Sequence, residues 1–298
     1  MTGGRSIEVI IPVRDMADHL PEILRPLLVQ LTDGDLVTVA NDASTDATEA
    51  VARSLGANVV TLPASRGPYY ARQVAACRSA ADILLFTDAR CRPLPGWLDA
   101  HRELQSRPGV ALSCTDVRTL SGPTLAARAA AREQPFSLRR MVEVPGRPDY
   151  YPTANLGIDR TVFEKVGGFR AMRSGGDADI CWRIQDQSLG TMAADPRVLM
   201  EWLPRTTIRD LASQWKRYGG STAYLEWVYG DYSPRPFGTD ESFGTKLRAG
   251  LQQWRMRLRG KPAEVLAAAA MDGVFAYGYL SARLKRSQFA MPVPYDLS

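Results

Sequence analysis

A short apolar run, residues 83–86, limits the possible folds of this chain more than any other stretch. Its four residues, Ile-Leu-Leu-Phe, are too few for a helix and leave no polar face, so they predict a strand buried on both sides. Asp88 follows after one threonine, and ligands of open α/β sheets bind at the carboxyl ends of parallel strands. Asp88 could therefore hold a ribose hydroxyl or a metal, while a loop aspartate that starts a turn before Pro93 remains the alternative.

Similar apolar runs precede this one, and helical spacing separates them. The predicted strands are residues 7–13, 36–40, 58–62 and 83–86. Regular alternation of strand and helix over about the first hundred residues predicts a parallel sheet with right-handed crossovers. Because Asp15, Asp42 and Asp88 end three of these strands, we expect their carboxylates along one edge of the sheet.

Composition narrows the class of protein. A chain of 298 residues with 45% hydrophobic content suits one large α/β domain with appendages. The four cysteines are widely scattered and there are two histidines, a pattern that favours neither a zinc site nor a serine-histidine hydrolase. The strand beginning at Ile7 leaves no room for a signal peptide before it, so we expect a cytoplasmic protein.

A second signal follows the third predicted strand. Arg66, Gly67 and Pro68 open a helix that carries Arg72. A glycine, a helix amino-terminus and two guanidinium groups could cradle a diphosphate, although the same residues would also serve an ordinary loop-to-helix junction.

Taken in order, these stretches resemble a known family. Residues 10–13, 41–46, 66–73 and 86–93 are similar to successive motifs of family-2 glycosyltransferases with the GT-A fold. The resemblance implies an α/β fold, with a Rossmann-like, mainly parallel sheet flanked by helices and followed by a helical C-terminal extension. It implies a glycosyltransferase domain over residues 1–218, with a nucleotide-binding half at 1–115 and an acceptor and catalytic half at 116–218, and a lid loop with the helical extension at 219–298.

The resemblance also implies a donor site for a nucleotide sugar. The residues it assigns to the nucleotide are Pro12, Asp15, Asp42, Arg66, Arg72 and Asp88. Asp88 would also be the metal ligand, for Mg or Mn. The second aspartate of the family's metal motif is replaced by Arg90, and an arginine cannot coordinate a divalent cation. Arg90 could instead clamp the diphosphate directly, which leaves metal dependence open.

The second half resembles the family's sugar and base motifs. Asn155 matches the segment beneath the donor sugar, with a buried structural asparagine as the alternative. Residues 174–183 are similar to the Glu-Asp-x-Asp motif. Gly176 replaces the glutamate of this motif, and Asp177 matches its catalytic base. The alternative for Asp177 is a helix N-cap. Asp179 and Arg183 are expected to orient the site beside the diphosphate and sugar.

Beyond this motif the sequence is less informative. Trp215, Arg217 and Tyr218 resemble the family's basic and aromatic acceptor-side segment, and residues 229–242 are interpreted as a lid or acceptor loop. Six basic residues and no acidic one fall within residues 246–261, which could lie on an anionic membrane or pack on the catalytic domain with a solvated face. Residues 265–280 are interpreted as too short and too polar to span a membrane.

Together these features predict an inverting glycosyltransferase that moves a sugar from a nucleotide sugar to an acceptor hydroxyl. The acceptor would be a small molecule, a lipid-linked molecule or a glycan, and not a nucleic acid. A nucleotide-sugar-binding homologue without catalysis is the alternative, because of Arg90 and Gly176. A sugar nucleotidyltransferase is a third and weaker one.

Overall fold

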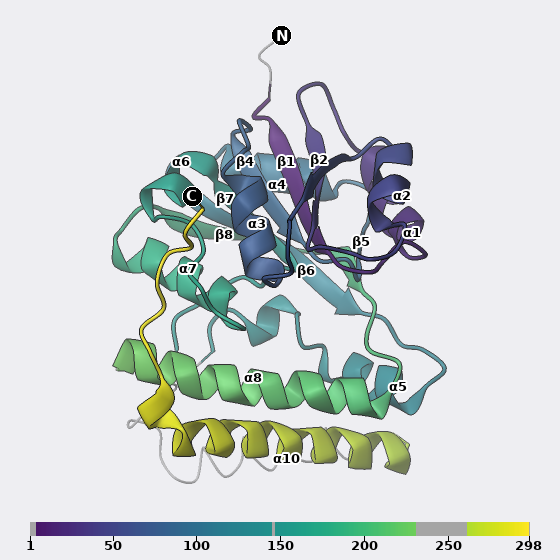
Figure 1. Cartoon of the computed structure of the whole chain (residues 1–298), viewed down its shortest axis with the longest axis vertical. Helices are drawn as coiled ribbons and strands as arrows, with labels where there is room; N and C mark the ends of the chain where they lie inside the picture. The colour runs from purple at the N-terminus through teal and green to yellow at the C-terminus, as the bar shows by residue number, and fades with distance from the viewer. Residues whose placement is uncertain (1–3, 145–146, 231–260, 298) are drawn as a thin grey trace.

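The computed structural model describes residues 4–144, 147–230 and 261–297, and Figure 1 shows their arrangement. One mixed sheet of eight strands carries helices on its faces, and the long helices α8 and α10 lie side by side beneath it (Figure 1). The strands are β1 Ile7–Val13, β2 Leu36–Asn41, β3 Asn58–Thr61, β4 Ile83–Thr87, β5 Cys91–Pro93, β6 Val110–Thr119, β7 Asn155–Asp159 and β8 Thr191–Trp202. The α-helices are α1 Leu20–Leu28, α2 Thr48–Ser54, α3 Pro68–Ala76, α4 Trp97–Gln105, α5 Leu125–Glu133, α6 Arg160–Lys165, α7 Gly176–Asp186, α8 Ile208–Tyr229 and α10 Pro262–Leu284. The 3-10 turns are η1 Leu138–Arg140 and η3 Arg286–Gln288.

The strand order in the sheet is β3-β2-β1-β4-β7-β6-β8-β5. β1 pairs in parallel with β2 and β4, and β2 pairs in parallel with β3. β7 runs antiparallel to both β4 and β6, and β8 is parallel to β6. The predicted α/β fold with a mainly parallel sheet is therefore confirmed.

The apolar run at residues 83–86 lies where its sequence predicts. β4 sits between β1 and β7, and all four of these side chains are fully buried. Phe86 packs against Phe163 and Phe169, with ring centroids 5.8 Å and 5.1 Å away. Burial on both faces fixes β4 in the core, so the loop that carries Asp88 starts from a rigid strand.

The structure departs from the predicted elements in its second half. α8 continues without a break through the boundary predicted at residue 218 and ends at Tyr229. The last helix has 23 residues, more than predicted, and by length and composition alone α10 would be sufficient to cross a membrane. The predicted lid loop and the basic segment lie outside the described residues, apart from Tyr229, Gly230 and Lys261 at their edges.

Candidate active site

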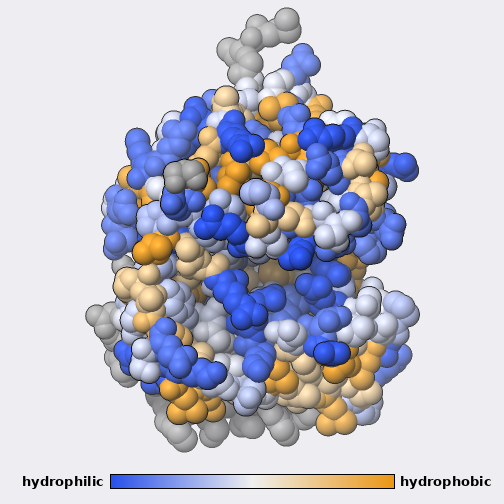
Figure 2. Space-filling view, viewed as in Figure 1, coloured by the Kyte–Doolittle hydropathy of each residue, from blue (hydrophilic) through white to orange (hydrophobic). Residues whose placement is uncertain are grey.

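A cleft of about 1210 Å³ lies between the loops at one edge of the sheet and the helix α8. Figure 2 shows it as a hollow across the middle of the molecule, bordered by hydrophilic residues. The predicted site residues that line it are Arg66, Arg72, Asp88, Asp177, Arg217 and Tyr218. These residues come from the β3–α3 loop, α3, the β4–β5 turn, α7 and α8, so stretches far apart in the sequence meet in one place.

Arg72 interacts with two of the carboxylates that line the cleft. It forms an ion pair with Asp88, and its positive charge also acts on Asp177. The Arg72 side chain is only 3% exposed, whereas that of Asp88 is 35% exposed. The Nε atom of Arg72 is buried and has no hydrogen-bond partner within the described residues. A buried guanidinium with a free donor is a site to which an anion would be attracted.

Tyr69, also on α3, contacts the side chain of Asp177. Its hydroxyl donates to Asp177 Oδ1 over 3.3 Å. The ring of Tyr69 lies so close to Gly176 that a Cβ at this glycine would come within 3.0 Å of the ring. The space that a side chain at position 176 would fill is therefore occupied by Tyr69.

Asp177 is the second residue of α7, and Gly175 is the N-cap. The N-cap alternative for Asp177 is therefore wrong, although Asp177 does accept a hydrogen bond from its neighbour, the Ala178 amide, over 3.0 Å. Burial raises the pKa of Asp177, because a charged carboxylate is poorly solvated there, and the nearby Arg72 opposes this shift. A carboxylate with a raised pKa is better suited to accept a proton near neutral pH.

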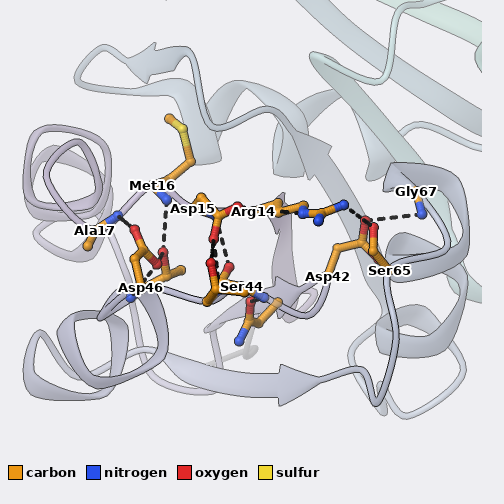
Figure 3. Close-up of polar contacts among 12 residues, drawn as sticks. Arg14, Asp15, Met16, Ala17, Asp42, Ser44, Asp46, Ser65 and Gly67 are labelled. Atoms are coloured by element: carbon orange, nitrogen blue, oxygen red, sulfur yellow. Dashed lines mark hydrogen bonds and ion pairs between the residues drawn. The ribbon is translucent and has the colours of Figure 1, made fainter.

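Asp42 shapes a wall of the cleft instead of lining it. Its carboxylate accepts hydrogen bonds from Ser65 Oγ at 2.8 Å, the Arg66 amide at 2.8 Å and the Gly67 amide at 3.1 Å. These contacts fix the loop that presents Arg66, whose guanidinium stacks 3.9 Å from the ring centroid of Tyr70. The cleft and Asp42 are thus joined through this loop (Figure 3).

Asp15 has a similar role one strand away. It adopts a positive φ of 51° and accepts hydrogen bonds from the Thr45 amide at 2.8 Å and the Thr45 hydroxyl at 3.2 Å. Figure 3 shows how it ties the loop after β1 to the loop after β2. Pro12 is buried within β1. Neither Asp15 nor Pro12 is among the described residues that line the cleft.

Asn155 is a correction to the sequence prediction. Its side chain is fully buried and all its hydrogen-bonding groups are used within the core. The Oδ1 atom accepts from Trp97 Nε1 at 2.7 Å and lies 2.9 Å from His101 Nε2, and the Nδ2 atom donates to the Thr115 carbonyl and hydroxyl, each at 2.8 Å. Burial lowers the pKa of His101 to about 4, so this imidazole is neutral. Asn155 is therefore the structural asparagine that the sequence left as the alternative.

Asp179 and Arg183 also face the protein and not the cleft. Asp179 is fully buried and accepts hydrogen bonds from Arg170, from Arg183 Nε at 3.0 Å and from the Tyr229 hydroxyl at 2.6 Å. Arg183 also donates to the carbonyls of residues 166 and 168. A direct contact with the diphosphate or sugar is therefore contradicted for both. They anchor α7 and so hold Asp177 in place.

Of the three residues predicted on the acceptor side, two line the cleft and one does not. Arg217 and Tyr218 line the cleft from α8, but Trp215 is 8% exposed and belongs to the hydrophobic core. Arg90 is half-buried and is not among the described residues that line the cleft. Arg205 does line the cleft, and Arg90 lies close enough to it for their charges to interact. Burial and the charge of Arg205 lower the pKa of Arg90.

A divalent cation fits this donor set poorly. Mg and Mn prefer several oxygen ligands, and within the described ranges no three carboxylate, histidine or cysteine side chains come together as a potential metal site. The predicted ligand Asp88 is already paired with Arg72, and the position two residues later carries the Arg90 guanidinium.

Sequence reasoning missed several residues that line the cleft, among them two tyrosines and an arginine. Tyr69 and Arg205 line it, as does Tyr295 from the segment after α10. That segment runs back across the molecule in Figure 1, where the Ala171 amide donates to the Val293 carbonyl over 2.8 Å. A long-range return of this kind carries no local sequence signal, whereas Tyr69 lay inside a motif that the sequence already indicated.

Comparison with known proteins decides the family. A sequence model described as glycosyl transferase family 2 matches residues 8–175, more than half of the chain. The chain belongs to glycosyl transferase family 2. The matched residues include Asp42, Arg72 and Asp88 and end just before α7.

Two curated relatives agree with this assignment. A pre-mycofactocin glycosyltransferase of Mycobacterium tuberculosis is 29% identical over 231 residues, which cover 74% of this family-2 chain and 47% of that protein. The glycosyltransferase AglE of Haloferax volcanii is 29% identical over 190 residues, covering 60% of this chain and 61% of AglE. The chain thus spans less than two thirds of the length of either relative.

Solved structures agree on the fold. The mannosyltransferase PcManGT of Pyrobaculum calidifontis, solved in complex with GDP-Man and Mn2+, superposes with a TM-score of 0.57 at 19% identity, covering 96% of this chain and 80% of that one. TarS of S. aureus superposes with a TM-score of 0.53 at 14% identity, covering 95% and 91%. At such low sequence identities, the two superpositions show only that this family-2 chain has a similar fold.

Proposed function

We propose that this protein is an inverting glycosyltransferase that moves a sugar from a nucleotide sugar to an acceptor hydroxyl. The observation that carries the proposal is that Asp177 and Asp88 line one cleft and share the charge of Arg72. Family membership supports the reaction class, and the two relatives named as glycosyltransferases agree with it.

The roles follow from position and charge. Asp177 is the base that removes the proton of the acceptor hydroxyl as this hydroxyl attacks the anomeric carbon, and its raised pKa suits that task. The bond from the anomeric carbon to the diphosphate breaks on the opposite face, which inverts the configuration. Arg72, Arg205 and Arg217 surround the space where negative charge grows on the leaving diphosphate, so they stabilise the transition state.

The non-catalytic alternative rests on Arg90 and Gly176, and the geometry at Gly176 weakens it. The Tyr69 ring fills the space left by the missing side chain, and its hydroxyl reaches the proposed base. Tyr69 therefore fills the position of the family's glutamate. Asp177 remains in the cleft as a carboxylate that can accept a proton. The nucleotidyltransferase alternative gains no support from this pairing.

An assay with a panel of nucleotide sugars tests the proposal. The protein is incubated with UDP-, GDP-, ADP- and dTDP-sugars, with and without a mixture of simple glycoside and lipid-like alcohol acceptors, and the released nucleoside diphosphate is measured. We expect release with one donor class, a rate increased by acceptor, and a product whose anomeric configuration in NMR spectra is opposite to that of the donor. Retained configuration would contradict the inverting mechanism, and binding of a donor without any release would favour the non-catalytic alternative.

We also propose a peripheral location at an anionic membrane surface. The support comes from α10, on which Leu266, Leu280 and Leu284 are 70%, 58% and 88% exposed and the exposed cations Arg283, Lys285 and Arg286 lie at one end. An apolar helix face beside basic residues is the pattern of interfacial helices. Sedimentation with phosphatidylglycerol vesicles, but not with phosphatidylcholine vesicles, is the expected result. Equal recovery in the supernatant with both lipids would contradict it.

A further inference from the structure

We infer that arginine side chains, and not a divalent cation, neutralise the diphosphate of the donor in this cleft. The inference rests on the proposed function, because it concerns the nucleotide-sugar donor. Beyond that function, we name the side chains that hold the diphosphate of the donor and distinguish this site from one that contains a metal.

The carboxylate best placed to bind a metal, that of Asp88, is already neutralised. Asp88 forms an ion pair with Arg72, whose side chain is 3% exposed. A cation that bound Asp88 would have to share this carboxylate with a guanidinium that is nearly fully buried. Leaving a buried charge without its partner is strongly unfavourable.

Arg72 keeps a hydrogen-bond donor that an anion could use. Its Nε atom is buried without a hydrogen-bond partner among the residues that the structure describes. Buried donors in native proteins are nearly always satisfied, so this atom marks a place where a ligand oxygen would complete the site. Arg72 lines the cleft, as a ligand contact requires.

Arg90 and Arg205 place two positive charges close together. Arg90 and Arg205 repel one another, and the main acidic group that acts on Arg90 is Asp210, which is exposed. Arg205 lines the cleft, and Arg217 enters it from α8. Like charges in a half-buried position are stabilised by an anion between them, and guanidinium groups bind phosphate oxygens in a bidentate manner.

Together these groups set the preference of the site. Arg205 and Arg217 present positive charge to the cleft, with Arg90 close to Arg205, while the charges of Arg72 and Asp88 compensate one another. A diphosphate carries the complementary charge. A divalent ion would instead enter a region that is already positive.

Calorimetric titration of the full chain with UDP, GDP, ADP and dTDP, each in EDTA and again in excess MnCl2, tests the inference. We expect at least one nucleoside diphosphate to bind with a Kd that differs by less than about twofold between the two conditions. Binding that disappears in EDTA and returns with Mn2+ would overturn the inference while leaving the proposed function intact. Failure of every nucleoside diphosphate to bind in both conditions would remove the proposed donor class, and with it the inference.

Variants identify the cations responsible. Arg205→Gln should raise the Kd of the bound diphosphate about tenfold in EDTA, the effect of losing a charge-assisted hydrogen bond, and Mn2+ should not restore it. Arg90→Gln should act in the same direction. Arg53→Gln is the matched control, because Arg53 is an exposed residue of α2 paired with Glu49 and lies outside the cleft. A Kd for Arg205→Gln equal to that of the control would overturn the inference, and a circular dichroism spectrum confirms that each variant is folded.

Discussion

The contact between Tyr69 and Asp177 is the residue-scale feature with the clearest chemical consequence. The Tyr69 hydroxyl donates to Asp177 Oδ1, and Gly176 leaves the ring room to reach it. Burial raises the pKa of Asp177. Because a hydrogen bond to a carboxylate stabilises its charged form, we expect the Tyr69 hydroxyl to oppose this rise. It also fixes the orientation of the carboxylate, which makes Tyr69 a positioning residue.

Replacing Tyr69 by Phe should therefore move the pH dependence of the reaction. Since the base must be ionised, activity falls as the pH drops through the pKa of Asp177. Loss of the donor raises this pKa further, so we expect the acid limb of kcat/KM to shift to higher pH while the basic limb stays in place. Tyr277→Phe, at a tyrosine on α10 that is 60% exposed, is the control. An acid limb that stays fixed or moves to lower pH would contradict the role of Tyr69.

Some of the residues that the sequence assigned to the site line the cleft and others do not, and the difference is physical. Asp88, Arg72 and Asp177 were found because strand ends and helix starts determine where such residues point. Asn155 and Asp179 lie in similar motifs but turn into the core, where they satisfy buried polar groups. A motif specifies which residues are near a site, whereas the direction of each side chain depends on partners from distant segments.

At the scale of elements, α7 is held by a buried charge cluster. Asp179 receives hydrogen bonds from two arginines and from Tyr229 at the end of α8, so it connects α7 to the helix beneath the cleft. The side chain of Asp179 is fully buried. The position of the proposed base therefore depends on this cluster.

We expect Asp179→Asn to lower the free energy of unfolding by about 3 kcal/mol, because it leaves two guanidinium groups without a buried counter-ion. Urea denaturation followed by circular dichroism measures this change. The control Glu49→Gln removes an exposed ion pair on α2 and should change the free energy by no more than about 0.5 kcal/mol. Equal effects for the two variants would show that the cluster does not stabilise the fold.

A second prediction concerns the contact between α8 and α10. A Cβ at Gly278 would lie 2.1 Å from the Lys216 carbonyl oxygen, and a Cβ at Gly273, on the same helix, would meet nothing within 4 Å. We expect Gly278→Ala to destabilise the protein by about 1–3 kcal/mol, as overpacking does. Gly273→Ala should stabilise it by about 0.5–1 kcal/mol, because alanine favours a helix. Melting temperatures that change in the same direction would contradict the close approach of the two helices.

At the scale of the whole molecule, the cleft is formed by parts of the chain that the sequence does not bring together. Helix α3 supplies Arg72, the β4–β5 turn supplies Asp88, α7 supplies Asp177, α8 closes the opposite side, and Tyr295 enters from the end of the described chain. Periodicity predicted the sheet because its strands are local and apolar. It could not predict the return of residues 291–297, since a backbone contact such as that between Ala171 and Val293 is independent of side-chain pattern.

The central claim is that one carboxylate of this cleft, Asp177, removes the acceptor proton while other groups hold the donor. The most direct measurement compares Asp177→Asn with the unchanged protein in two assays, donor binding by calorimetry and sugar transfer at saturating donor, with Asp99→Asn at an exposed position of α4 as the control. We predict that the donor Kd of Asp177→Asn stays within about twofold and that kcat falls by about a hundredfold or more, the usual contribution of a general base. Transfer by Asp177→Asn at the rate of the control would contradict the claim.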